Sequence, residues 1–431
     1  MNAVVHPPAQ ATWPRPFVIV ARATDTEFQF LLFACWLLLP TALSFPGRGG
    51  PLDLGAFDSV AILKATLRGS AFVLLGLLAL RLNSNARMLP VLRRIAPLAL
   101  FAAWCGISFL WSPLMTVSLG HAMELVTMVL LVICAGILVD SEEKLKTLFC
   151  HLFLALFSLA ALTLILEAPM IIAGERPTGY LHPNALGSIS ATALFLLLAC
   201  RVLWNWHWTR VLVLPGVTVC LAAIFFARSR SSFLVAIVLA ILFWICRGRA
   251  LLVTALFVGG ALMAFVPYVT TVANLPDTAE NYLLRGQTQD DLMGASGRDE
   301  LWALALTSFR ESPLLGHGYY MLSSSGTMYV WQKQQYQTAH NLGLHVLTGT
   351  GTIGALLFLW GFGVAFAPIV GARREKLMFL TLLLSAWFLL VGCFELSILG
   401  PVDPASVAFF AILGAAAAPR PSAGGQPQCA Y

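Results

Sequence analysis

Long apolar runs recur along this chain from near residue 28 to near residue 418. A helix needs about 20 apolar residues to cross the roughly 30 Å of hydrocarbon in a bilayer, and many of these runs reach that length. Only 11% of the 431 residues are charged, against about 25% in soluble domains, and 59% are hydrophobic. The sequence therefore predicts an all-α integral membrane protein and excludes a soluble globular domain.

The pattern predicts about twelve transmembrane helices. They are expected at 28–45, 69–82, 95–111, 121–139, 147–172, 186–204, 210–227, 231–247, 250–268, 340–368, 376–393 and 402–418. Residues 1–27 are rich in proline and lack a long apolar core, so we interpret them as a tail and not as a signal peptide. The expected organisation is a tail at 1–27, a transmembrane domain at 28–418 and a second tail at 419–431.

The distribution of Lys and Arg predicts the orientation of these helices. Placing the N-terminus inside puts most of the 26 Lys and Arg residues in inner connections and tails, as the positive-inside rule requires. Both tails are then cytoplasmic, and the long connection at about 269–339 faces outward. The net charge of +6 is divided among these connections, so no nucleic-acid partner is expected.

The long outer connection contains one predicted helix of its own. Ser296 is a suitable cap, Asp299 follows three residues later, and Pro313 and Gly316 end the pattern. The apolar stripe consists of Leu301, Trp302, Leu304, Ala305 and Phe309. Such an amphipathic helix is expected to lie in the interface plane, with its apolar face toward lipid or the helix bundle.

Polar residues gather in four clusters at the outer ends of the predicted spans. Because charge is expensive to place in a membrane, such clusters indicate where function should be sought. The nine cysteines show no paired spacing of a metal site or disulfide framework, so neither is expected. The clusters are Arg176-Pro177-x-Gly179 with Pro183-Asn184, Arg228-Ser229-Arg230-Ser231-Ser232, Ser296-Gly297-Arg298 followed by Trp302 and Pro313-Leu314-Leu315-Gly316-His317-Gly318, and His340-Asn341 before a Gly-rich helix.

Taken together and in this order, the four clusters resemble the O-antigen ligase and polymerase superfamily of membrane glycosyltransferases. The resemblance covers about residues 170–360, and the N-terminal third adds no motif of its own. It implies a GT-C-like helical bundle in the bacterial inner membrane with its active site facing the periplasm. As a ligase, such a protein moves a glycan from undecaprenyl diphosphate to the outer core sugar of lipid A-core and completes lipopolysaccharide, without metal, nucleotide or other cofactor.

The resemblance also suggests roles for individual residues. Arg228 and Arg298 are the first candidates for binding the donor diphosphate, with Arg176 and Arg230 second, since guanidinium binds phosphate through paired hydrogen bonds. His340 is the candidate base that takes the proton of the acceptor hydroxyl, because histidine titrates near neutral pH. Attack opposite the leaving group would invert the anomeric centre.

Further residues of the clusters are candidates for contacting substrate. They are Asn341, His317, Asn184 and Trp302. A turn role is the stronger expectation for His317, which lies between two glycines. Glu395, near the outer end of the predicted span 376–393, receives no role from sequence.

Three other functions stay open at this point. A repeat-unit polymerase and a protein O-oligosaccharyltransferase belong to the same superfamily, and the ligase is favoured only by a compact chain with one main outer loop. A transporter would also explain many spans with charges among them. It is disfavoured because the sequence shows no matching broken helices in two repeated halves and because the polar clusters share one face.

Overall fold

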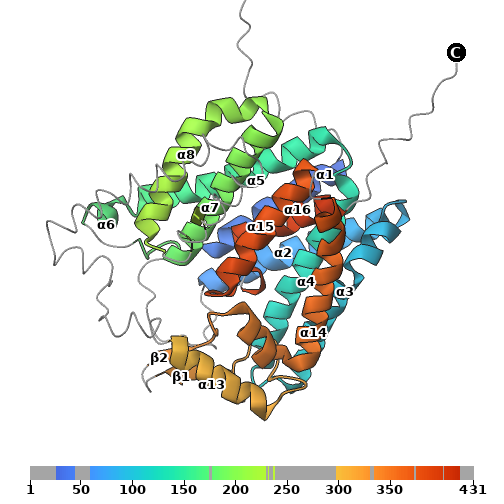
Figure 1. Cartoon of the computed structure of the whole chain (residues 1–431), viewed down its shortest axis with the longest axis vertical. Coiled ribbons are helices and arrows are strands. Elements are labelled where there is room, and N and C mark those ends of the chain that lie inside the picture. The colour runs from blue at the N-terminus through green and yellow to red at the C-terminus, as the bar shows by residue number, and fades with distance from the viewer. Residues whose placement is uncertain are drawn as a thin grey trace, which may run out of the picture.

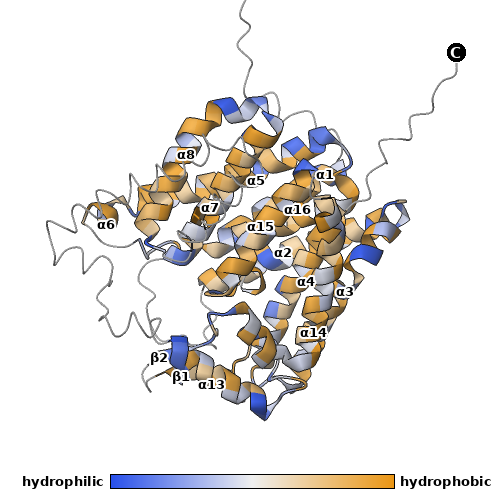
Figure 2. Ribbon diagram, in the orientation of Figure 1, coloured by the Kyte–Doolittle hydropathy of each residue, from blue (hydrophilic) through white to orange (hydrophobic). Residues whose placement is uncertain are grey.

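The computed structural model describes residues 26–43, 59–173, 177–229, 232, 236–237, 298–330, 334–372, 375–400 and 402–417. Their regular structure is helical except for one small hairpin, and seven of the described helices are long and apolar enough to span a membrane. The predicted all-α class is therefore confirmed. Hydrophilic residues lie mainly at helix ends and around the hairpin, while the helix bodies are hydrophobic (Figure 2).

Ten of the twelve predicted spans fall on helices, and those at 231–247 and 250–268 lie almost wholly outside the described residues. The hairpin pairs β1 (Met328–Val330) with β2 (Gln334–Tyr336). The helices are α1 (Thr26–Leu38), α2 (Ser59–Arg81), α3 (Met88–Ile107), α4 (Met115–Leu138), α5 (Glu142–Leu166), α6 (Ala168–Ile172), α7 (Pro183–Ala199), α8 (His207–Ala227), α13 (Arg298–Glu311), α14 (Leu342–Gly371), α15 (Lys376–Gly392) and α16 (Pro404–Ala417).

Several predicted boundaries are wrong, and for two of them the structure shows the reason. Helix α2 begins well before the predicted residue 69. Arg68 interrupts the apolar run in the sequence, but in the structure it is ion-paired with Glu124 of α4, so the helix continues through it. The predicted span 147–172 breaks at Glu167 and continues only as the short α6. The buried Glu167 carboxylate instead accepts the backbone N–H groups of Gly179 (3.1 Å) and Tyr180 (2.7 Å), which folds the following loop back onto the end of α5.

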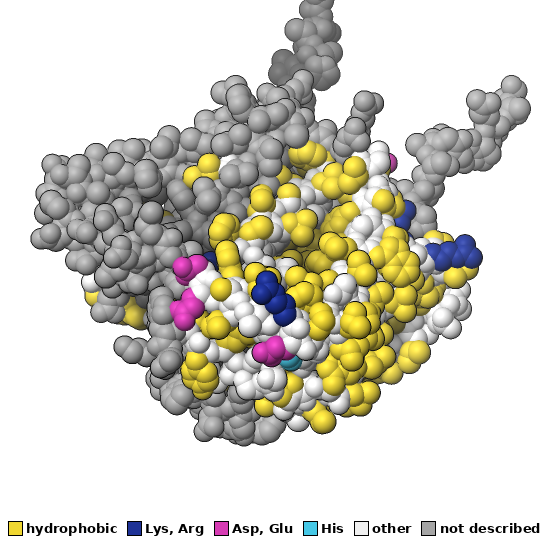
Figure 3. Space-filling view, turned by 60° about the horizontal axis from the view of Figure 1, so that its bottom comes forward, with side chains coloured by type: hydrophobic (Ala, Val, Ile, Leu, Met, Phe, Trp, Pro, Cys, Tyr) yellow, Lys and Arg dark blue, Asp and Glu magenta, His cyan; other side chains and the backbone are white. Residues whose placement is uncertain are grey.

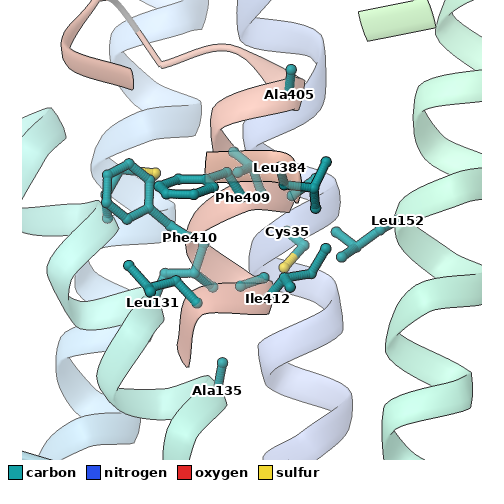
Figure 4. Packing of buried hydrophobic residues seen from close by; sticks show 14 of the residues in the cluster. Cys35, Leu131, Ala135, Leu152, Leu384, Ala405, Phe409, Phe410 and Ile412 are labelled. Atoms are coloured by element: carbon teal, nitrogen blue, oxygen red, sulfur yellow. The ribbon is translucent and has the colours of Figure 1, made fainter. Parts of the chain in front are cut away.

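Helix α16 lies at the centre of the bundle. Although it has only 14 residues, all of them are buried. Gly414 packs so closely on α4 that an added Cβ would lie 2.5 Å from the backbone oxygen of Val132, as is typical of small residues between membrane helices. Figure 4 shows Phe409, Phe410 and Ile412 of α16 among Cys35 of α1, Leu131 and Ala135 of α4, Leu152 of α5 and Leu384 of α15.

Basic residues of the predicted inner connections meet at one end of the bundle. Arg81 pairs with Glu27 at 2.8 Å, joining the end of α2 to the start of α1. Arg94 donates to the carbonyl oxygen of Ala417 at 2.7 Å and so caps the end of α16. Helix α13 and the hairpin lie at the opposite end (Figure 1), where a few charged side chains interrupt a largely hydrophobic surface (Figure 3).

The predicted helix in the outer connection is confirmed as α13, which ends at Glu311, before Pro313. Its buried residues Leu301 and Ala305 pack against Leu322 and the hairpin, while Leu304 is partly exposed. Helix α13 therefore packs Leu301 and Ala305 against the loop that carries the hairpin. The predicted cap Ser296 lies outside the described residues.

Candidate active site

Glu395, in the turn after α15, joins three of the predicted polar clusters. Its Oε2 accepts a hydrogen bond from Nδ1 of His340 at 2.8 Å. Its Oε1 accepts from Nη2 of Arg298 at 2.9 Å and from Nδ2 of Asn184 at 2.6 Å. We call these four residues the Glu395 cluster. Because a carboxylate only accepts, His340 donates through Nδ1, and in the neutral ring the lone pair is then on Nε2.

The Glu395 cluster keeps its carboxylate ionised. Burial by itself raises the pKa of Glu395, but the hydrogen bond from His340 and the charges of His340 and Arg298 outweigh it and hold that pKa below its ordinary value. With a lowered folded-state pKa, the stabilisation from this carboxylate is complete above the unfolded-state pKa. It is lost only as the pH falls through the folded-state value, so the cluster is intact at neutral pH.

The backbone of His340 is held on both sides of the residue. His340 has a left-handed conformation, with φ of 45°, which is costly for a residue other than glycine. On one side, Nε1 of Trp302 donates to the carbonyl oxygen of Ala339 at 2.9 Å. On the other side, Asn341 caps α14 by accepting the N–H of Leu344 at 3.0 Å. Trp302 and Asn341, both predicted to contact substrate, therefore orient the loop of the candidate base.

Arg228 ends α8 in a left-handed conformation, with φ of 49°. The hydroxyls of Ser229 and Ser232 are 3.0 Å apart and lie against α7, where a Cβ added to Gly187 would come within 2.9 Å of Oγ of Ser232. Ser229 and Ser232 of the Arg-Ser-Arg-Ser-Ser motif are thus packed on the first turns of the helix whose Asn184 belongs to the Glu395 cluster.

Some site residues were missed or cannot be placed. Arg176 and Arg230 lie outside the described residues. Sequence reasoning gave Glu395 no role, although one signal was available, namely an acidic residue at the membrane-proximal end of an apolar helix. Its partners are far away in sequence, so only the fold identifies them.

The Pro-Leu-Leu-Gly-His-Gly motif at 313–318 fills a break in α14. Gly351 leaves the helical conformation, with φ of 65° and ψ of −169°. The N–H of Thr352, which loses its helical partner there, donates to the carbonyl oxygen of Pro313 at 2.8 Å. We call 313–318 the bridging segment. Broken backbone is tolerated at membrane depth where other protein satisfies it, and the bridging segment does so here.

His317 lies within the bridging segment and is only 8% exposed. Its Nε2 is 2.9 Å from the hydroxyl oxygen of Ser308 on α13. Its backbone N–H donates to the carbonyl oxygen of Thr348 on α14 at 2.9 Å. The ring and backbone of His317 therefore tie α13 to α14, in agreement with the turn role that the flanking glycines suggest.

Replacing Gly351 by alanine is expected to destabilise the protein by on the order of 3 kcal/mol. Its backbone region suits only glycine, and an added Cβ would collide with the carbonyl group of Leu314. Thermal unfolding of purified protein in detergent measures the loss as a lower Tm. Gly363→Ala is the matched control on the same helix, since its Cβ would meet nothing within 4 Å. Equal Tm values for the two variants would contradict the expectation.

Comparison with known proteins shows which family the chain resembles. Residues 215–359 match a family model described as O-antigen ligase. The resemblance to the O-antigen ligase family is confirmed. The O-antigen ligase of Pseudomonas aeruginosa PAO1 is 28% identical over 201 residues, covering 44% of this chain and 43% of that protein. The alignment thus spans less than half the length of the curated relative.

The O-antigen ligase match contains seven of the nine candidate residues, namely Arg228, Arg230, Arg298, Trp302, His317, His340 and Asn341. Asn184 and Glu395 lie on either side of the matched interval. The fold brings both of them to His340 and Arg298, so the Glu395 cluster extends beyond the part of the chain that the O-antigen ligase family model covers.

Proposed function

We propose that this protein is an O-antigen ligase. It transfers a glycan from undecaprenyl diphosphate to the outer core sugar of lipid A-core at the periplasmic face of the inner membrane. The Glu395 cluster carries the proposal, because it holds a histidine with a basic nitrogen beside an arginine at one end of the bundle. The separation of this end from Arg81 and Arg94 supports the orientation.

His340 acts as the general base in this proposal. Glu395 holds Nδ1–H, so Nε2 receives the proton of the acceptor hydroxyl as its oxygen attacks the anomeric carbon. The carboxylate then stabilises the imidazolium that forms, as in other histidine–carboxylate pairs. The new bond joins the acceptor oxygen to the sugar, the bond to phosphate breaks, and the lipid diphosphate leaves with the electron pair. The anomeric centre is inverted.

Arg298 and Arg228 bind the departing diphosphate. A guanidinium carries five N–H donors, and the hydrogen bond from Nη2 of Arg298 to Glu395 orients the group while leaving others for phosphate oxygens. Fixed donors aimed at developing negative charge commonly contribute a few kcal/mol each to lowering the barrier. Because arginine supplies the positive charge, the proposed mechanism needs neither metal nor nucleotide.

Replacing Arg298 by lysine should lower the transfer rate about 10- to 100-fold although the charge is kept. An ammonium group cannot hold Glu395 and bind phosphate through paired hydrogen bonds at the same time. Initial rates of glycan transfer with purified protein measure this effect. Arg310→Lys on the exposed face of α13 is the matched control and should keep the wild-type rate. Equal rates for the two variants would remove Arg298 from the proposed site.

Transfer in vitro tests the function itself. Purified protein receives undecaprenyl-diphosphate-linked glycan and lipid A-core, without metal or nucleotide, and the products are separated and their anomeric configuration determined. Glycan on lipid A-core with inverted configuration is the expected result. Longer lipid-linked glycan would instead indicate a polymerase, glycan on an added protein an oligosaccharyltransferase, and retained configuration would overturn the proposed mechanism.

A further inference from the structure

A groove of about 590 Å³ opens between α1, α2 and α4, and the residues of the Glu395 cluster are not part of its lining. Its apolar lining includes Leu38 of α1, Phe72 of α2, and Val117 and Met123 of α4. The two helices that form its sides are candidate membrane spans, so lipid chains are expected beside the groove. We call it the α2–α4 groove. Its apolar surface suits an acyl chain.

The α2–α4 groove also has a polar part. Arg68 of α2 is ion-paired with Glu124 of α4, and Nδ1 of His121 lies 3.1 Å from Oε2 of the same carboxylate. Lys64, one turn from Arg68 on α2, lines the groove as well. Ionisable groups within membrane helices are costly and usually mark a substrate path. This polar part of the groove suits a headgroup that offers hydrogen-bond acceptors.

Two hydrogen-bond donors of residues that line the groove lack partners. Among the described residues, the buried Nε of Arg68 and Nε2 of Gln337 are without an acceptor. Buried donors without acceptors are rare and unfavourable. If the ion pair of Arg68 with Glu124 served only to join α2 to α4, these two donors would have no explanation. Phosphate or sugar oxygens are suitable acceptors. Gln337 lies three residues before His340, so the groove reaches the loop of the candidate base.

The groove and the helices α7 and α8, which carry candidate residues for the donor, lie in different parts of the bundle. In the bundle, α15 and α16 lie between α4 and the pair α7 and α8, which carries Asn184 and Arg228 (Figure 1). An inverting transfer requires the acceptor hydroxyl to approach opposite the departing diphosphate. If the diphosphate is held on the α7 and α8 side, the acceptor is expected on the α4 side.

We propose that the α2–α4 groove binds the acceptor, a phosphorylated glycolipid with several acyl chains. An acyl chain lies along the wall that contains Phe72 and Met123, and phosphate or sugar oxygens of the headgroup pair with Arg68 and Gln337. The headgroup sugar then extends past Gln337 toward Nε2 of His340. This inference rests on the proposed function, because it states where the acceptor of that reaction binds.

Two glycines allow the groove to be filled without disturbing the fold. Gly69 on α2 and Gly120 on α4 line the groove, and a Cβ added at either would meet nothing within 4 Å. Gly69→Leu and Gly120→Leu therefore place a side chain in the space of the lipid. Gly76→Leu is the matched control, since Gly76 lies on α2, has equal space and does not line the groove.

The first measurement is retention of lipid A-core by the purified full chain without donor, which does not depend on transfer. The groove variants should retain at least tenfold less than Gly76→Leu, and their KM for lipid A-core should rise at least tenfold with the donor KM unchanged. Undiminished retention in both groove variants, loss of donor binding instead, or equal displacement of lipid A-core by phosphatidylglycerol would each overturn the groove as the acceptor site.

A second comparison separates this inference from the proposed function. Retention that depends on the groove, without transfer to lipid A-core by the wild-type protein, would refute the ligase but leave the groove as a glycolipid site. Transfer that proceeds equally well in wild type and in both groove variants would support the ligase and refute the groove.

Discussion

Replacing His340 by asparagine is expected to lower the kcat of glycan transfer by about 10²- to 10⁴-fold, the usual contribution of a general base. Asparagine tolerates the left-handed backbone that His340 adopts, so the loop before α14 keeps its shape. Its side chain can still hydrogen-bond to Glu395 but cannot take a proton from the acceptor. Steady-state rates at saturating donor and acceptor measure the loss.

Two further variants complete this test. His340→Ala should lose transfer to the same extent while the protein remains folded and inserted, although alanine is less suited to the left-handed backbone. His207→Asn, at the exposed start of α8, is the matched control and should keep the wild-type rate. A wild-type rate in either His340 variant would show that another group, or water alone, takes the proton.

Replacing Glu395 by glutamine should lower kcat by roughly 10²- to 10³-fold. Glutamine has nearly the same shape, but its NH₂ group can donate to Nδ1 of His340, which favours the ring tautomer with hydrogen on Nε2. That tautomer cannot accept the acceptor's proton, and the imidazolium loses its stabilising carboxylate. Glu395 is thus a positioning residue for His340, and its loss is expected in kcat more than in the KM of either substrate.

A double variant distinguishes positioning from general structural damage. If Glu395 acts through His340, then the combination of Glu395→Gln with His340→Asn should be no slower than His340→Asn alone, because residues that act as a unit are not additive. Multiplied losses would mean that Glu395 acts independently of the histidine. Binding of the diphosphate-linked donor is the accompanying measurement, because Arg298 also depends on this carboxylate.

Hydrophobicity predicted the helices well because the bilayer imposes a length on every spanning segment. It failed where a polar residue has a partner elsewhere in the chain. The first half of α2 was missed since the pairing of Arg68 with Glu124 cannot be seen from either helix alone. The end of α5 was extended too far because Glu167 takes two backbone N–H groups from a loop that follows.

The sequence predicted residues of the candidate site but not the contacts between them. The sequence pattern singled out Arg298, His340 and Asn184, and the structure joins all three through Glu395, which had no assigned role. For the glycines near Gly351, the sequence indicated only a Gly-rich helix after His340-Asn341. That the bridging segment supplies its missing hydrogen bonds is a property of three-dimensional contact, for which a single sequence contains no direct signal.

The break in α14 has a mechanical consequence. Because the bridging segment and the broken helix complete each other's hydrogen bonds, α13 and the first turns of α14 are expected to move as one rigid unit. Arg298 and His340 both lie in this unit, so the distance between them is expected to stay the same when the unit moves. Asn184, on α7, and Glu395, in the turn after α15, do not belong to this unit. Access for a bulky glycan is then expected to begin with separation of Arg298 and His340 from Glu395, while Asn184 and Glu395 stay hydrogen-bonded to each other.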